Sequence, residues 1–231
     1  MGSMDDLQRD AAGIGTLADP VRRQLYRFVC SQPEPVSRDQ AAEAVGIARH
    51  QAKFHLDRLA AEGLLDCDYA RLTGRSGPGA GRPSKLYRRA RRDIAVSLPQ
   101  REYELAGRLM ADAIAESAAT GVPAVEVLHR IAHDYGRAIA QHAERRPRDA
   151  ESALEIAAAV LTEHGYEPRR IDGEICLANC PFHTLARRQT ELACGMNHAL
   201  IAGVAEALAP HSPHARLQPG EARCCVVLTS G

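Results

Sequence analysis

The chain has 231 residues, with 29 basic and 29 acidic side chains and therefore no formal net charge. Hydrophobic residues make up 45% of it and charged residues 25%, which is ordinary for a globular protein. No apolar run reaches the ~18 residues that a membrane span requires, so the sequence excludes an integral membrane protein. The length predicts one large domain or two small ones.

The first residues indicate a protein that is not exported. Residues 1–4 (Met-Gly-Ser-Met) resemble a remnant of an expression vector before a native start at Met4, and no signal sequence follows them. We therefore expect residues 1–13 to be this remnant and a flexible arm, and the protein to be cytoplasmic. Its seven cysteines are then expected to stay reduced and to serve metal binding or redox sensing.

Basic charge is concentrated in the first half of the chain. Residues 19–93 contain 15 Lys and Arg against 9 Asp and Glu, and residues 71–92 hold 8 basic residues and no acidic one. A local positive field of this kind attracts polyanions.

Two short helices are predicted at the start of this basic region. Apolar residues recur at helical spacing over residues 21–29, and Pro20 suits the first helical position. Ser37 and Gln40 have the spacing of a capping box, which predicts that a second helix begins there and covers residues 38–45.

A third helix and a strand hairpin follow. Gly46 separates the second helix from the third, which is predicted over residues 49–62. The inward face of this third helix carries Ala52, Leu56 and Leu59. Two extended segments, residues 66–72 and 84–90, then flank a glycine-rich basic stretch. The order of three helices and a basic hairpin is that of a winged helix.

Three segments resemble ArsR-related winged-helix repressors: Leu-Ala-Asp-Pro-Val-Arg-Arg at 17–23, the stretch 45–65, and Gly-Arg-Pro-Ser-Lys-Leu-Tyr at 81–87. The resemblance implies a winged helix-turn-helix domain over residues 14–95 that binds double-stranded operator DNA, with the helix from Arg49 in the major groove. Polar side chains of that helix suit base edges and phosphates, and cations of the hairpin suit phosphates. The candidate DNA-binding residues are Arg49, His50, Gln51, Lys53, Arg75, Arg82 and Lys85.

The chain is expected to form a homodimer. One winged helix covers about one half-site, so specific binding needs two copies at a fixed separation. Residues 96–121 are the expected linking and dimerisation element, with a long helix over residues 98–117. The apolar side of this helix packs either against its symmetry mate or against its own C-terminal domain.

Residues 122–231 are predicted to form a C-terminal α/β sensor domain rich in cysteine. Helices are expected over residues 122–143, 150–164 and 190–208. Strands are expected over residues 166–171, 174–178, 215–218 and 221–228. The turn pair Asp172-Gly173 joins the first two strands into a hairpin.

The candidate metal ligands lie in the last 56 residues and are Cys176, Cys180, Cys194, Cys224 and Cys225. Because Pro181 suits a first helical position, Cys180 is expected at the N-cap of a helix running toward residue 189, where the helix dipole favours its thiolate. Cys224 and Cys225 are neighbours on an expected strand and point to opposite faces, so only one of them should ligate the centre. His183, three residues after Cys180, is the alternative fourth ligand.

This half of the chain resembles the C-terminal domain of SufR-like regulators, repressors that sense iron–sulfur clusters through the pattern C-x12-C-x13-C-x14-C. Here 13 residues separate Cys180 from Cys194 and 29 separate Cys194 from Cys224. The family's third cysteine would fall near Leu208 or Ala209, where there is none. The fourth ligand is therefore open to Cys176, Cys225, His183 or an outside molecule. The resemblance implies an iron–sulfur cluster of the [4Fe–4S] type, with zinc as the alternative.

The sequence as a whole predicts a mainly α fold with a small β content. The function that it predicts is a DNA-binding transcriptional repressor whose operator affinity is controlled by the cysteine-ligated centre. The alternative is a winged-helix regulator that senses a small organic ligand and holds a structural zinc at the cysteines. An enzyme is not expected, because the chain has no C-x-x-C motif, no phosphate-binding glycine motif and no recognisable set of nucleophile, base and acid.

Overall fold

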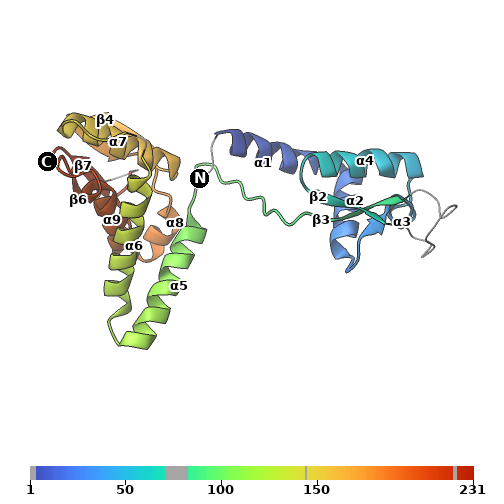
Figure 1. Ribbon diagram of the computed structural model, residues 1–231, viewed down its shortest axis with the longest axis horizontal. Helices are drawn as coiled ribbons and strands as arrows, with labels where there is room; N and C mark the ends of the chain where they lie inside the picture. The colour runs from blue at the N-terminus through green and yellow to red at the C-terminus, as the bar shows by residue number, and fades with distance from the viewer. Residues whose placement is uncertain (1–3, 71–82, 144, 221–222) are drawn as a thin grey trace. The chain divides into compact units, whose positions relative to one another are not determined.

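The structure, a computed structural model, describes residues 4–70, 83–143, 145–220 and 223–231 (Figure 1). The chain divides into two compact units, with the boundary between Val96 and Ser97. The fold is mainly helical with two small sheets, as predicted. None of the helices among the described residues is long and apolar enough to cross a membrane.

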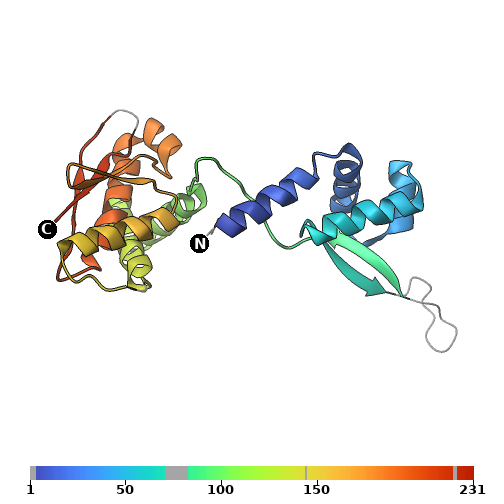
Figure 2. The same ribbon diagram turned by 90° about the horizontal axis from the view of Figure 1, so that it is seen from above.

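In the part of the N-terminal unit that the structure describes, there are four helices and three strands. The helices are α1 (Met4–Thr16), α2 (Pro20–Ser31), α3 (Arg38–Val45) and α4 (Arg49–Ala61), and the strands are β1 (Val36–Ser37), β2 (Leu65–Ala70) and β3 (Ser84–Arg89). The strands form an antiparallel sheet in the order β1-β3-β2. Figure 2 shows β2 and β3 side by side as the hairpin of a winged helix.

Local capping determines where the helices of this unit begin and end. The carboxylate of Asp19 accepts a hydrogen bond from the backbone N–H of Arg22 at 2.9 Å and caps α2. Ser37 and Gln40 form the predicted capping box of α3. Gly46 ends α3 with a φ of 72°, a left-handed conformation that favours glycine. The predicted limits of α2, α3 and α4 were therefore correct to within two residues.

The first residues form a helix, so the expectation of a flexible arm over residues 1–13 was wrong for those that the structure describes. Helix α1 packs against α4. Asp10 of α1 forms an ion pair with Arg92, and a Cβ atom at Gly13 would lie 3.2 Å from the side chain of Ile94. The arm is ordered because it covers the end of α4 and the segment that leaves the wing.

The core of the N-terminal unit lies between the helices and the sheet. Leu25 of α2, Leu56 and Leu59 of α4, and Tyr87 of β3 are almost completely buried there. The predicted inward face of α4 is confirmed, since Ala52 is buried as well. The opposite face of α4 is therefore the one that meets solvent.

Among its described residues, the C-terminal unit contains five helices and a four-stranded antiparallel sheet in the order β4-β5-β7-β6. Its helices are α5 (Tyr103–Thr120), α6 (Ala124–Gln141), α7 (Ala150–Glu163), α8 (His183–Arg188) and α9 (Thr190–Glu206). Its strands are β4 (Pro168–Ile171), β5 (Glu174–Leu177), β6 (His214–Leu217) and β7 (Val226–Thr229). Asp172 and Gly173 join β4 to β5 with φ angles of 49° and 83°, as the turn pair predicted.

Helix α5 belongs to the C-terminal unit. Figure 1 shows α5 and α6 side by side as a helical hairpin. Leu105, Leu109 and Ala113 of α5 are buried in the core that α6, α7, α9 and the sheet also build. Of the two predicted roles of the helix, covering its own domain is therefore the one seen in this chain. Ile114 remains 63% exposed.

Helices α6 and α9 approach each other at backbone distance. A Cβ atom at Gly136 would lie 1.9 Å from the carbonyl oxygen of Leu200, and one at Gly203 would lie 2.0 Å from the carbonyl oxygen of His133. Real Cβ atoms do not come this close to backbone atoms, so both positions require glycine. The two glycines allow α9 to lie deep in the core, where it positions Cys194 and Asn197.

Candidate functional site

The exposed face of α4 carries most of the residues predicted to bind DNA. Arg49 is 79% exposed, and its Nε atom lies 3.5 Å from a carboxylate oxygen of Asp39. His50 and Lys53 are exposed on the same helix. Gln51 is also exposed, but its amide oxygen accepts a hydrogen bond from the backbone N–H of Ala48 at 3.2 Å. Gln51 therefore caps the N-terminus of α4. The sequence analysis assigned it only a contact with bases.

The remaining predicted DNA-binding residues belong to the wing. Arg75 and Arg82 lie outside the described residues. Lys85 of β3 is described, and its ammonium group lies 2.6 Å from a carboxylate oxygen of Asp57 on α4. Its charge is thus already paired within the unit, which makes it a link between the wing and α4.

A second hydrogen bond reinforces this link. The buried hydroxyl of Tyr87 donates to the same oxygen of Asp57 at 2.9 Å. Burial alone would raise the pKa of Asp57, but the hydrogen bonds from Lys85 and Tyr87 outweigh it, and the pKa lies below its ordinary value of 3.8. A charged Asp57 therefore holds the sheet at a fixed place on α4.

Replacing Asp57 by asparagine is expected to lower the free energy of unfolding of the N-terminal unit by ~1–2 kcal/mol at neutral pH, because Lys85 and Tyr87 lose a charged acceptor. A carboxylate with a lowered pKa stabilises the fold above its unfolded pKa, and this stabilisation is lost as the pH falls through the folded pKa. Between pH 7 and pH 2, the free energy of unfolding should thus fall less steeply with pH in Asp57→Asn than in the wild type. Asp66→Asn, whose carboxylate lies 4.0 Å from Arg88, is the control and should change little.

Two exposed aromatic residues on the N-terminal unit were missed by the sequence analysis. Phe54 of α4 is 65% exposed and Tyr69 of β2 is 70% exposed. The helical spacing did contain a signal for Phe54, since a residue two positions from Ala52 and from Leu56 lies far from the buried stripe.

The C-terminal unit brings four of the five candidate metal ligands together. The thiol of Cys224 is hydrogen-bonded to those of Cys180 and Cys225, and the thiol of Cys225 to that of Cys194. We call these four residues the thiol cluster. They come from the loop after β5, from α9 and from the segment that leads into β7, so only the tertiary fold brings them together.

Hydrogen bonds favour one negative charge in the thiol cluster, and they place it on Cys224. The pKa of Cys224 is lowered mainly because its sulfur accepts hydrogen bonds from Cys180 and Cys225. The backbone N–H of Val226 and the side chain of Asn197 also bind this sulfur, the latter at 3.1 Å from Nδ2 to Sγ. The pKa of Cys180 and that of Cys225 are raised, because each donates to Cys224 and each is partly buried.

Buried polar groups support this charge from inside the core. Asn197, which is 1% exposed, donates to Cys224 and accepts a hydrogen bond from the hydroxyl of Tyr166. Asn197 lies on α9 one turn after Cys194, on the same face of the helix. The sequence analysis did not single it out, although a polar residue on an otherwise apolar helix face was a usable signal.

Cys180 is held by a loop and does not cap a helix. Helix α8 begins at His183, and Cys180 precedes the turn that leads into it, so the expected N-cap position was wrong. Arg101 donates to the backbone oxygen of Cys180 at 2.6 Å and to the side-chain oxygen of Asn179 at 2.8 Å. The expected lowering of the Cys180 pKa by the helix dipole was therefore wrong as well, since its neighbours raise it.

Cys224 and Cys225 both belong to the thiol cluster, contrary to the expectation that they point apart. That expectation required both residues to lie in a regular strand, but β7 begins only at Val226. The irregular backbone before the strand lets the two sulfurs face each other.

The two other candidate ligands lie elsewhere. Cys176 lies on β5 between Ile175 and Leu177, which pack into the core, so strand alternation places it on the opposite face of the sheet. There its sulfur accepts a hydrogen bond from Arg223 at 3.2 Å. His183 is exposed at the first position of α8.

The thiol cluster suits a thiolate-ligated centre by its chemistry. It offers four sulfur donors, which is the ligand number of structural zinc and of iron–sulfur clusters. Asn197 and backbone N–H groups already point at sulfur, as the supporting groups of metal ligands do. The thiols form a row in the order Cys180, Cys224, Cys225 and Cys194. Within the described residues, no three His, Cys, Asp or Glu side chains are arranged as ligands of one ion. Binding would thus require the sulfur atoms to lose their protons and close around the centre.

A groove between α6 and α7 is a second candidate site. It has a volume of about 690 Å³, which lies within the range of ligand sites, and apolar side chains such as Ile139, Ile156 and Val160 line it. It shares Glu163 and His164 with a polar hollow of about 220 Å³.

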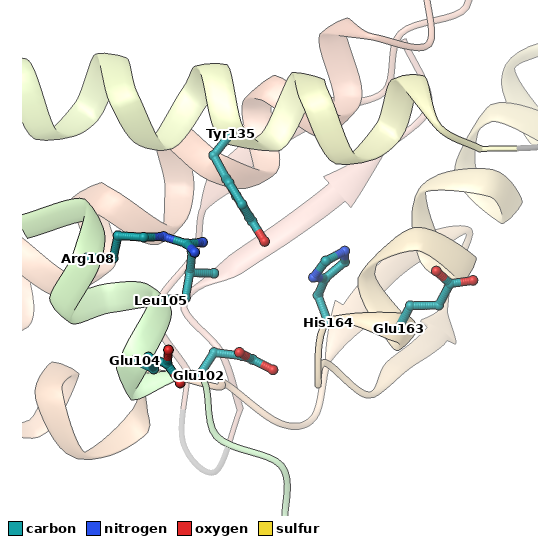
Figure 3. A pocket seen from close by; sticks show the side chains of 7 residues that line it. All are labelled: Glu102, Glu104, Leu105, Arg108, Tyr135, Glu163 and His164. Carbon is teal, nitrogen blue, oxygen red and sulfur yellow. The ribbon is translucent and has the colours of Figure 1, made fainter. Parts of the chain in front are cut away.

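Figure 3 shows Glu102, Tyr135 and His164 pointing into this polar hollow. Burial lowers the pKa of His164, although the charge of Glu102 opposes the shift. The imidazole is therefore neutral at neutral pH and can both donate and accept a hydrogen bond.

One comparison with known proteins finds a match. A family model described as a helix-turn-helix domain matches residues 17–68, which contain α2, α3 and α4. No curated protein and no solved structure matches the chain. The N-terminal unit therefore carries a helix-turn-helix domain of the winged type, and this domain indicates a DNA-binding transcriptional regulator.

Proposed function

We propose that this protein is a transcriptional repressor whose operator affinity is controlled by a centre bound at the thiol cluster. The centre is an iron–sulfur cluster, with zinc as the alternative, and the regulator works as a homodimer in the cytoplasm. The observation that carries the proposal is the convergence of Cys180, Cys194, Cys224 and Cys225 in a chain that also has a helix-turn-helix domain.

The residues of the cluster have distinct roles in this proposal. Cys224 starts as the charged ligand, because its hydrogen bonds favour the thiolate, which is the form that binds a metal. Asn197 keeps that sulfur oriented, and Arg101 holds the loop of Cys180. An iron–sulfur cluster, when bound, would supply sensitivity to oxidant and to iron supply, whereas zinc would supply stability alone.

Control of DNA binding follows from linkage. The sulfurs join three segments of the C-terminal unit, so a bound centre stabilises one arrangement of the loop after β5, α9 and the start of β7. If two copies of the chain hold their winged helices at the operator spacing in only one arrangement, the centre changes operator affinity. The change equals the difference in binding free energy of the centre between the two arrangements.

Contacts of α4 with phosphates predict a strong dependence of DNA binding on salt. Each phosphate contact contributes about 0.9 to the slope of log K against log salt concentration. In the double variant Arg49→Ala/Lys53→Ala, loss of two such contacts per chain is expected to lower that slope by about 2 per chain. Fluorescence anisotropy with a labelled duplex between about 50 and 200 mM salt measures this slope.

The matched control removes the same charge from the other unit. Arg130 and Arg137 of α6 pair with Glu116 and Glu206, and Arg130→Ala/Arg137→Ala should leave the slope unchanged. Equal slopes in wild type and in the α4 variant would contradict the assignment of α4 to DNA. A wild-type protein that binds no duplex would contradict the proposed function itself.

The groove between α6 and α7 favours a second candidate function. A regulator that senses an organic molecule would bind it along Ile139, Ile156 and Val160, with the neutral His164 at the polar end. The thiol cluster would then hold zinc only for stability. In that case operator affinity would follow the organic ligand and would not respond to oxidant.

A further inference from the structure

The centre of the solvent face of α4 is an aromatic ring. Successive residues of a helix are ~100° apart, which places Phe54 nearly opposite the buried stripe of Ala52, Leu56 and Leu59. Its side chain is 65% exposed, although phenylalanine has no polar group to interact with water.

The ring has a defined orientation. It makes an edge contact with the imidazole of His55, with ring centroids 5.3 Å apart and an angle of 73° between the ring planes. His55 is itself half buried and adjacent to the charge of Asp19. The phenyl ring therefore projects from the helix into solvent and is held in place by its contact with His55.

Single exposed apolar residues are common on protein surfaces and need no partner. At this position, however, the neighbours of Phe54 on α4 are polar or cationic. Arg49, His50 and Lys53 are exposed on the preceding turn, and Asp57, which would oppose an anion, is bound to Lys85. A partner of this face must therefore meet two requirements: it must carry negative charge opposite the cations, and it must offer an apolar group to the phenyl ring. A flat apolar protein surface satisfies only the second requirement.

The major groove of DNA satisfies both requirements. Phosphates line its edges, and the 5-methyl group of thymine is an apolar feature on its floor that other bases lack. We propose that Phe54 is a specificity-determining residue that contacts the methyl group of a thymine in each operator half-site. This inference rests on the proposed function as a DNA-binding regulator, and it assigns a base preference that the predicted polar contacts do not provide.

The test compares thymine with deoxyuridine, which differs only by the absence of this methyl group. Duplexes are first selected from a random library with the full-length wild-type protein. Each thymine of the selected duplex is then replaced by deoxyuridine. Burial of one methyl group corresponds to about a fourfold change in Kd. Replacing the contacted thymine in one half-site should therefore weaken binding about fourfold, and replacing it in both half-sites about 15-fold.

Phe54→Ala should bind the thymine and deoxyuridine duplexes equally, whereas Phe54→Leu, which keeps an apolar side chain, should retain part of the preference. Tyr69→Ala is the matched control, because it removes an equally exposed aromatic residue of the same unit and should keep the full preference. The inference is wrong if no thymine of the selected duplex shows the methyl effect, or if Phe54→Ala shows it as strongly as the wild type. Failure of the wild type to select any sequence would instead contradict the proposed function.

Discussion

Replacing Gly136 by alanine is expected to lower the free energy of unfolding of the C-terminal unit by ~3 kcal/mol, the upper part of the range for overpacked cores. The new Cβ atom would lie 1.9 Å from the backbone oxygen of Leu200, and a backbone atom cannot rotate away as a side chain can. Helices α6 and α9 must therefore move apart, which loosens the packing around Leu200 and Val204. Gly203→Ala should behave in the same way, since its Cβ atom meets the backbone of His133.

Hydrogen exchange measured by mass spectrometry on peptides of α6 and α9 reports this effect for the C-terminal unit alone. The control is Gly107→Ala on α5, where a Cβ atom meets nothing within 4 Å. Because alanine is a better helix former than glycine, this control should raise stability by ~0.5–1 kcal/mol. Unchanged protection of α6 and α9 in Gly136→Ala would mean that the two helices are not in backbone contact.

Replacing Cys224 by serine is expected to abolish metal binding and, with it, the control of operator affinity. Cys224 and Cys225 each have two sulfur neighbours, but of the two only Cys224 has a lowered pKa, and its removal breaks the row of contacts in the middle. Iron, acid-labile sulfide and zinc are assayed on protein purified without oxygen. In the wild type, loading or removing the centre should change operator affinity by roughly 5- to 150-fold, the usual range of allosteric coupling. In Cys224→Ser the two preparations should bind the operator equally.

Cys176→Ser provides the sharpest control for this experiment. Cys176 was a candidate ligand on sequence grounds, but it lies on the opposite face of β5, so its loss should leave metal content and coupling intact. Loss of metal in Cys176→Ser together with retention in Cys224→Ser would overturn the assignment of the thiol cluster. One zinc per chain and no response to oxidant would favour the organic-ligand sensor. Cys180→Ser/Cys194→Ser removes the thiols that the loop after β5 and α9 contribute, so its metal content and its operator binding should match those of Cys224→Ser.

Local signals explain why much of the fold could be predicted. Pro20, Ser37 with Gln40, and Gly46 act within a few residues of their own position, so they allowed the limits of α2 and α3 to be predicted. The pair Asp172-Gly173 determined a hairpin for the same reason. Helix α1 was missed because its order depends on contacts with α4 and Arg92, which are distant in the chain.

The site was only partly predictable. The sequence identified α4 as the helix that presents Arg49, His50 and Lys53, because helical periodicity alone separates a buried from an exposed face. It did not reveal that Lys85 is bound to Asp57, since the two residues come from different elements. The aromatic centre of the face, Phe54, was within reach of the same periodicity and was overlooked.

By itself, the sequence determined that the chain has a winged helix-turn-helix domain followed by a cysteine-rich α/β domain, because caps, turns and periodicity are local properties. Only the tertiary structure decided which thiols meet. Cys180, Cys194 and Cys224 are brought together by the packing of α9 and by the residue at which β7 begins. If β7 began two residues earlier, Cys224 and Cys225 would alternate along the strand and only one sulfur could face the cluster, and no local signal in the sequence specifies where a strand starts.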